Sequence, residues 1–245
     1  MLIIRSNILS EQNNLVFGLS SKVGDYKNEN FHFNMSKSIG DNEEKVNRNR
    51  KLFFNKLNLS EDNVVIQKQT HGDIINVINS ADQNLEGDAI ITSTPNIGLA
   101  ISTADCNNIF IYDKSKKVIA AVHSGWKGTE IKILEKTLNK LKDEYNSDPK
   151  DLIVYAGPAI SKENYEVGEE VASKFDEKYI EQKNNSDKYL LDLKKANMDM
   201  VLKFGVPEAN IQFSQMCSYK SEELQSYRRE GEKSGRALGI IALKE

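Results

Sequence analysis

VIAAVHSGWKG, residues 118–128, is the stretch of the chain that says most about the fold. Its first five residues are small or apolar, which is typical of a buried strand. His123 follows directly, and the glycines Gly125 and Gly128 turn the chain toward an amphipathic helix. The stretch therefore places a basic, metal-competent side chain at the carboxyl end of a strand, where open α/β sheets usually bind ligands.

Several short apolar runs surround this stretch and predict a sheet. Strands are expected at residues 2–5, 15–19, 64–69, 74–78, 89–92, 99–103, 109–112, 118–122, 152–156, 211–213 and 238–243. Helices are expected at residues 41–57, 168–179 and 193–204, and an exposed loop at 181–188. This mixture of strands and helices, without a linker or an internal repeat, predicts a single α/β domain over residues 1–245.

The clearest predicted helix begins after Gly128 and ends at Asp148-Pro149. Thr129 is a plausible cap for it. Its apolar residues recur at spacings of three and four and therefore share one face: Ile131, Leu134, Leu138, Leu141 and Tyr145.

The composition is that of an ordinary globular protein. Of 245 residues, 39% are hydrophobic and 28% charged, and the net charge of −3 gives no overall attraction to nucleic acid or to anionic lipid. Two cysteines far apart make no disulfide framework, which favours a reduced, cytoplasmic setting. The apolar run at the N-terminus is too short for a signal peptide, and no stretch reaches the ~20 apolar residues of a membrane span.

Three residues that ligate zinc well each follow an apolar run: His71, Cys106 and His123. Catalytic zinc sites use three protein ligands and keep one position open, so this set predicts a site built from three strand ends. The spacing is not a local motif, and two alternatives remain open. The three residues could be ordinary core and polar residues, or Cys106 could be a nucleophile with His123 as its base and Asp105 orienting the histidine.

Two segments have the chemistry of anion binding. The backbone N–H groups of residues 125–128 lie at a predicted helix start beside Lys127. Near the C-terminus, Arg228, Arg229 and Arg236 fall within nine residues of an arginine-poor chain, and arginine binds phosphate or carboxylate in a bidentate manner. Alternatively, residues 125–128 are a plain strand–helix connection, and the arginines form a surface salt-bridge cluster.

The order of these motifs resembles the YfiH-like, or laccase-domain, family, which carries the name of multicopper polyphenol oxidases. The motifs that carry the resemblance are Phe33-Asn34-Met35, Gly40-Asp41-Asn42, Asn49-Arg50, Gln69-Thr70-His71-Gly72, Gly87-Asp88-Ala89, Thr103-Ala104-Asp105-Cys106, His123-Ser124-Gly125-Trp126-Lys127-Gly128, Gly157-Pro158, Tyr165-Glu166-Val167-Gly168 and Ser226-Tyr227-Arg228-Arg229. They span nearly the whole chain. The chain departs from the family where Lys22, Lys127 and Asn108 replace two arginines and a proline, and where Gly24 stands for a glycine pair.

The resemblance implies a fold and an activity. The fold would have mixed β-sheets sandwiched between helices, related to toxin-type cysteine hydrolases. The activity would be phosphorolysis of adenosine, inosine and methylthioadenosine, with deamination of adenosine, at a zinc site formed by His71, Cys106 and His123. For the mechanism, we expect Asp105 to shuttle a proton and Arg50, Lys127 and Arg229 to bind phosphate.

The oxidase name conflicts with the ligand count. Four copper ions each need several histidines, and the chain has three in all, so only a single copper at the zinc site is compatible with the sequence. Three alternatives remain: a cysteine- or zinc-dependent hydrolase that edits cell-wall precursors, a polyphenol oxidase with one copper, and a non-catalytic zinc-stabilised binding module. The sequence does not predict the oligomeric state.

Overall fold

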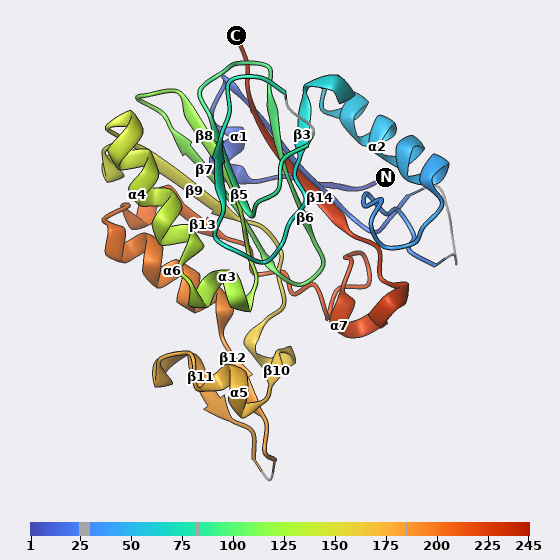
Figure 1. Ribbon diagram of the computed structural model, residues 1–245, viewed down its shortest axis with the longest axis vertical. Helices are drawn as coiled ribbons and strands as arrows, with labels where there is room; N and C mark the ends of the chain where they lie inside the picture. Colours follow the sequence, from blue (N-terminus) through green and yellow to red (C-terminus); the bar gives the residue numbers. More distant parts are fainter. Residues whose placement is uncertain (25–29, 82–83, 185) are drawn as a thin grey trace.

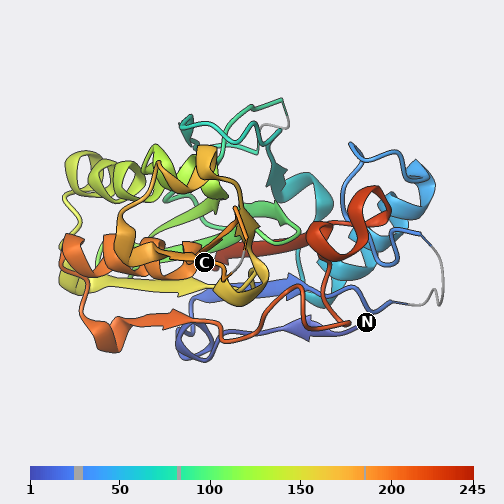
Figure 2. The same ribbon diagram turned by 90° about the horizontal axis from the view of Figure 1, so that it is seen from below.

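Two mixed β-sheets lie face to face, and helices cover the outer face of each (Figures 1 and 2). The computed structural model describes residues 1–24, 30–81, 84–184 and 186–245. On one outer face lies α2 (Glu43–Lys56), and on the other lie α4 (Ile133–Tyr145) and α6 (Leu193–Phe204). The expected α/β fold, with mixed sheets sandwiched between helices, is confirmed.

The two sheets differ in strand order. The five-stranded sheet has the order β1 (Ile3–Ile4), β2 (Leu15–Ser20), β14 (Ala237–Leu243), β6 (Gly98–Thr103) and β3 (Val64–Ile66). The six-stranded sheet has the order β13 (Ile211–Phe213), β9 (Leu152–Ala156), β7 (Asn107–Asp113), β8 (Val118–Ser124), β5 (Ala89–Thr92) and β4 (Ile75–Val77). Parallel pairs occur only at β3–β6, β4–β5 and β9–β13 among the described strands of these sheets.

Side chains alternate between the two faces of each strand, and this alternation builds two apolar layers. In β7, Phe110 and Tyr112 enter the core between the sheets, whereas Ile109 and Ile111 pack in the cluster beneath α4. Because successive side chains of a strand point to opposite faces, His123 lies on the same face of β8 as Ile119 and Ala121, which is the face toward the other sheet.

Residues 193–204 form the predicted helix as α6, but the other predicted helices are shorter or broken. The single helix expected after Gly128 is divided into α3 (Trp126–Glu130) and α4, because Lys132 between them adopts a left-handed conformation with φ of 60°. Thr129 does not cap a helix; its hydroxyl donates to the Gly125 carbonyl within α3. The remaining short elements are α1 (Asn7–Ser10), α7 (Tyr227–Glu230) and the 3₁₀ turns Glu61–Asn63, Pro149–Asp151, Lys162–Asn164, Glu208–Asn210 and Gly231–Lys233.

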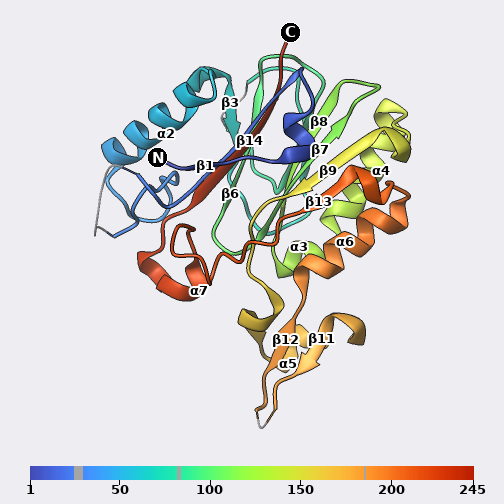
Figure 3. The ribbon, with the colours of Figure 1, turned by 180° about the vertical axis from the view of Figure 1, so that it is seen from behind.

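A small three-stranded sheet projects from the body of the molecule (Figure 3). It contains β10 (Glu166–Val167), β12 (Tyr189–Leu191) and β11 (Ile180–Gln182). The helix predicted at residues 168–179 is wrong, since only α5 (Glu169–Ala172) and the 3₁₀ turn Glu177–Tyr179 form there. Extended backbone at Asp176 interrupts the segment, and its apolar side chains pack around Leu191 in a cluster of their own. The first residues of the predicted loop belong to β11.

Within the described ranges, no helix is long and apolar enough to cross a lipid bilayer.

Candidate metal centre

The structure brings His71, Cys106 and His123 together at one end of the sheet sandwich. His71 lies on the connection from β3 to β4, and Cys106 on the connection from β6 to β7. Both connections cross from the five-stranded to the six-stranded sheet, and His123 lies at the end of β8 between them. One potential ligand atom from each residue lies within 4.8 Å of the other two. The predicted set is thus assembled, with two of its members in crossing loops rather than in strands.

Asp88 organises two of the three residues, although the sequence analysis gave it no role. Its buried carboxylate accepts hydrogen bonds from the backbone N–H groups of Thr70 (3.0 Å), His71 (3.0 Å) and Gly72 (2.8 Å). Its Oδ1 also lies 2.8 Å from Nδ1 of His123. Burial raises the pKa of Asp88, but the His123 contact and these N–H groups outweigh it and bring the pKa to about 2. The Asp88 carboxylate is therefore ionised at neutral pH.

This contact fixes how His123 can act. A neutral imidazole whose Nδ1–H donates to a carboxylate presents Nε2 as a free acceptor or ligand. Rings of His71 and His123 meet edge to face, with centroids 4.8 Å apart and an interplanar angle of 86°. The backbone of His71 is left-handed, with φ of 58°, and the three N–H bonds to Asp88 hold this turn in place.

Cys106 and His123 shift each other's pKa in opposite directions. Burial alone would raise the pKa of the thiol, but the charge of His123 and hydrogen bonds from His123 and His71 lower it to about 6. Burial would likewise lower the pKa of His123, yet the Cys106 and Asp88 charges raise it to about 9. Without a metal ion, the pair is therefore a thiolate and an imidazolium near neutral pH, and a thiolate is the form that binds metals.

Gly125 is required by the close approach of its backbone to the site. A Cβ atom at this position would lie 2.8 Å from Sγ of Cys106 and 3.4 Å from Cδ2 of His71. Any side chain here would displace a ligand, which explains why a glycine follows His123 so closely.

The carboxylate of Asp105, the predicted proton shuttle, is engaged in two hydrogen bonds within the protein. Its Oδ1 accepts a hydrogen bond from the hydroxyl of Ser218 (2.6 Å), and its Oδ2 accepts one from the backbone N–H of Arg228 (2.7 Å). Its φ of 89° is strained for a residue with a side chain. These contacts tie the Cys106 turn to α7, so they favour a positioning role, and proton transfer by Asp105 stays a prediction.

A cleft with a volume of about 880 Å³ opens onto the three candidate ligands. Its lining also includes Arg50 and Arg236 from opposite ends of the chain and the aromatic ring of Tyr227. Arg50 donates from Nε to the Met35 carbonyl (2.7 Å), and its two terminal nitrogens make no hydrogen bond among the described residues. Arg50, one of three predicted phosphate ligands, therefore lines the same cleft as the three candidate metal ligands.

The other two predicted phosphate ligands do not line the cleft. Lys127 is exposed, with Nζ 5.6 Å from the centroid of the Trp126 ring. The guanidinium of Arg229 donates to four backbone carbonyls, those of Ser218, Tyr219, Ser221 and Leu224, at 2.5 to 3.1 Å. These contacts give Arg229 a structural role in the loop before α7, and phosphate binding by Arg229 and Lys127 stays a prediction.

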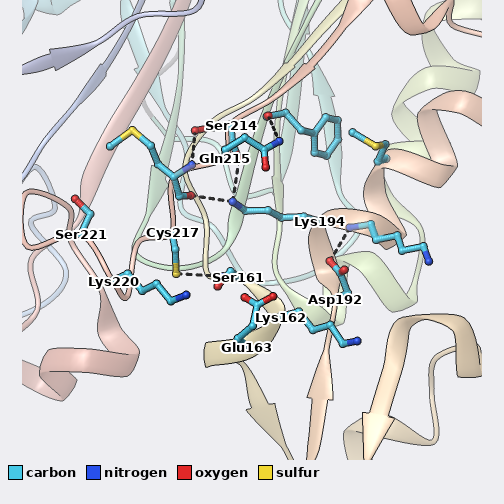
Figure 4. Close-up of a pocket in the computed structure, with 14 residues that line it drawn as sticks. Ser161, Lys162, Glu163, Asp192, Lys194, Ser214, Gln215, Cys217, Lys220 and Ser221 are labelled. Atoms are coloured by element: carbon cyan, nitrogen blue, oxygen red, sulfur yellow. Dashed lines mark hydrogen bonds between the residues drawn. The ribbon is translucent and has the colours of Figure 1, made fainter.

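A second cavity, of about 590 Å³, shares no lining residue with the cleft (Figure 4). Cys217 lies on its wall, and its sulfur accepts hydrogen bonds from the N–H of Ser161 (3.3 Å) and the amide of Asn164 (3.6 Å). Lys194 spans the cavity wall and donates from Nζ to the carbonyls of Ser214 and Met216. Cys217 is therefore separate from the candidate metal cluster and is a buried thiol.

Comparison with known proteins identifies the class. The chain belongs to the family of multi-copper polyphenol oxidoreductase laccases, whose model matches residues 16–244. It is 34% identical to a purine nucleoside phosphorylase of Bacteroides thetaiotaomicron, over 96% of this chain and 94% of that protein. It is 42% identical to a purine nucleoside phosphorylase of Clostridium acetobutylicum, over 72% of this chain and 75% of that protein.

Solved structures agree with this assignment. The fold matches Bacillus licheniformis YfiH with a TM-score of 0.89 and 28% identity, over 96% of this chain and 94% of that chain. It matches Geobacillus stearothermophilus YlmD with a TM-score of 0.88 and 27% identity, over 98% and 94% of the two chains. The predicted resemblance to the YfiH family is confirmed.

The donor set suits one metal ion. The chain has three histidines, and His32 is not part of the cluster, so a four-copper centre cannot be built. Zinc sites commonly use two imidazoles and a thiolate as ligands and keep a fourth position open. A carboxylate that accepts the other ring N–H of a histidine ligand, as Asp88 does here, is also typical of zinc sites. The same ligands also bind copper strongly.

Proposed function

We propose that this protein is a zinc-dependent purine nucleoside phosphorylase that also deaminates adenosine. The single observation that carries the proposal is the assembly of His71, Cys106 and His123 in a cleft that also contains Arg50. The relatives named purine nucleoside phosphorylases, one of which aligns over nearly the whole chain, support the substrate class. Adenosine, inosine and methylthioadenosine are the proposed substrates, and the cytoplasm is the proposed location.

The chain's own residues prepare the metal site. Asp88 keeps His123 in the tautomer that leaves Nε2 for the metal and holds the His71 turn through backbone N–H groups. Cys106 supplies a thiolate because its lowered pKa keeps it deprotonated at neutral pH. When bound, zinc would act as a Lewis acid and would activate water for the deamination reaction.

Phosphorolysis needs a phosphate oxygen to bond to ribose C1′ while the bond between C1′ and the purine nitrogen breaks. The electron pair of that bond leaves with the base, which takes up a proton. We assign the phosphate to Arg50, because this residue lines the cleft and its terminal nitrogens have no protein acceptor among the described residues. Half-burial of this guanidinium strengthens a charge-assisted, bidentate contact with phosphate.

Incubation of metal-analysed protein with adenosine, with and without phosphate, tests the proposal. We expect adenine and ribose-1-phosphate to appear only with phosphate, and inosine to appear in either condition. Arg50→Lys should raise KM for phosphate more than KM for adenosine, because lysine keeps the charge but loses the bidentate contact. Zinc-loaded protein that forms neither adenine nor inosine would refute the nucleoside assignment.

A second candidate function has one observation in its favour. The lowered pKa of Cys106 beside an imidazolium is also the arrangement of cysteine hydrolases. In that case Cys106 would attack an acyl carbon of a substrate such as a cell-wall precursor, and metal would inhibit. Activity that rises when metal is removed, and is lost on alkylation of Cys106, would favour this hydrolase over the phosphorylase.

A further inference from the structure

One aromatic side chain in the cleft lies half in solvent. Tyr227, the first residue of α7, is 50% exposed and belongs to the cleft lining. It is the only aromatic residue of that lining, among the described residues, apart from the two candidate histidine ligands. Exposure of a large aromatic ring inside a cleft is a common property of surfaces that bind flat ligands.

One contact holds this ring, and a cap holds the helix that carries it. The Arg236 guanidinium lies over the Tyr227 ring, 5.3 Å from its centroid, and donates to the carbonyls of Ser234 and Gly235. The buried hydroxyl of Ser226 caps α7 by accepting the N–H of Arg229. Arg236 therefore covers the ring on one side while half of the residue stays exposed, so little side-chain entropy remains to be lost when a ligand stacks on the exposed part.

α7 is also tied directly to the metal cluster. Asp105 precedes Cys106 in the turn and accepts the N–H of Arg228, the residue after Tyr227. This carboxylate–backbone bond sets the position of the aromatic ring relative to Cys106. A ligand that stacks on Tyr227 would extend from the ring into the cleft that holds the candidate metal ligands and Arg50.

We propose that Tyr227 is the residue that binds the purine base, by stacking, and thereby determines specificity for nucleosides. The inference rests on the proposed function, which supplies the purine. Phosphate and ribose have no aromatic surface, so the base is the part of the substrate that a tyrosine ring recognises. Base–aromatic stacking is lost on alanine substitution at a cost that corresponds to about 5- to 100-fold in affinity.

The test compares wild type with Tyr227→Ala, Tyr227→Phe and a matched control, Tyr219→Ala. Tyr219 is a second exposed tyrosine, 37% exposed, and does not line the cleft. We expect Tyr227→Ala to raise KM for adenosine about 5- to 100-fold, with kcat changed much less and KM for phosphate unchanged. Tyr219→Ala should behave as wild type, because it leaves the cleft untouched. Tyr227→Phe keeps the ring and should therefore retain most of the affinity for adenosine that Tyr227→Ala loses.

Two measurements separate this inference from the proposed function. If wild type does not turn over adenosine, the phosphorylase proposal fails, and equilibrium dialysis with adenosine then tests stacking directly by comparing wild type with Tyr227→Ala. Weaker binding by Tyr227→Ala supports the inference in either case. The inference is overturned if Tyr227→Ala has an unchanged KM or affinity for adenosine, or if it loses bound metal. It is also overturned if wild type does not bind adenosine.

Discussion

Asp88 holds two of the three candidate ligands at once. Its carboxylate fixes the tautomer of His123 through Nδ1 and the left-handed turn of His71 through backbone N–H groups. A single buried side chain thus couples two loops that the chain brings from different strands. The geometry of the candidate metal site depends on this residue although it does not itself belong to the cluster.

Asp88→Asn should weaken metal binding and activity by roughly 10- to 100-fold, as substitutions behind metal-bound histidines commonly do. Asparagine keeps the size of the side chain but loses its charge and one acceptor oxygen. Metal affinity is measured by competition with a chelating dye. Asp73→Asn, an exposed aspartate near His71 with a surface ion pair to Lys136, is the control and should bind metal normally. Normal affinity in Asp88→Asn would contradict this account of Asp88.

The pKa of Cys106 predicts a pH dependence for the metal-free protein. An ordinary thiol has a pKa near ~8.5, whereas that of Cys106 is lowered to about 6. Because the folded-state pKa lies below the unfolded one, the thiolate contributes stability that is present at high pH and lost as pH falls through about 6. Alkylation of Cys106 should follow the same titration.

We therefore expect the rate of Cys106 alkylation by iodoacetamide to reach half its maximum near pH 6. Peptide mass spectrometry distinguishes Cys106 from Cys217, and prior addition of zinc should protect Cys106 alone. A midpoint near that of an ordinary thiol, or equal protection of both cysteines by zinc, would contradict the assigned pairing with His123.

The sequence predicted that His71, Cys106 and His123 would meet, but it did not predict that Asp88 would support them. His71, Cys106 and His123 could be selected because so few histidines and cysteines are present and each follows an apolar run. Asp88 lies between a glycine and a strand and belongs to one of the motifs of the family resemblance, but neither signal indicates which residues it supports. The sequence could not show that the Arg229 guanidinium donates to backbone carbonyls, because those carbonyls are brought to it by the geometry of the loop.

Among the elements, α2 shows how a helix stabilises the sheet that carries the site. Phe53 and Phe54 of α2 are buried against Ala100 of β6 and Leu238 of β14. β6 leads directly into the Cys106 turn, so the packing of α2 on the sheet supports one side of the cleft.

Phe53→Ala should therefore reduce the free energy of unfolding by about 3 to 5 kcal/mol, because it removes a fully buried aromatic ring and leaves a cavity. Urea denaturation measures the change. Leu52→Ala, the neighbouring residue with 37% of its side chain exposed, is the matched control and should lose much less stability. Equal losses in the two variants would show that α2 does not pack as described.

Some predicted elements formed as expected and others did not. The short apolar run 89–92 forms β5, with its side chains divided between the two apolar layers, and residues 193–204 form α6. The predicted helix at 168–179 failed because its apolar residues serve a small local cluster around Leu191 instead of a continuous helix face. The break at Lys132 follows from backbone conformation and left no trace in the apolar spacing.

The whole molecule explains why the site lies where it does. Two connections cross between the facing sheets at one end of the sandwich and deliver His71 and Cys106 to the end of β8. Strand order decides which connections cross, and strand order is not encoded in local periodicity. The sequence could thus predict a mixed α/β fold and the convergence of three candidate ligands, whereas the face-to-face arrangement of the sheets needed the structure.

The central claim is that one metal ion in the His71–Cys106–His123 cluster is required for phosphorolysis. The most direct measurement is a titration of metal-free protein with zinc, in which bound metal and phosphate-dependent release of adenine from adenosine are followed together. The account predicts that activity rises in proportion to bound zinc and is complete at one equivalent. Cys106→Ala should bind no zinc and should have no activity. Full phosphorolysis by metal-free protein, or by zinc-free Cys106→Ala, would contradict it.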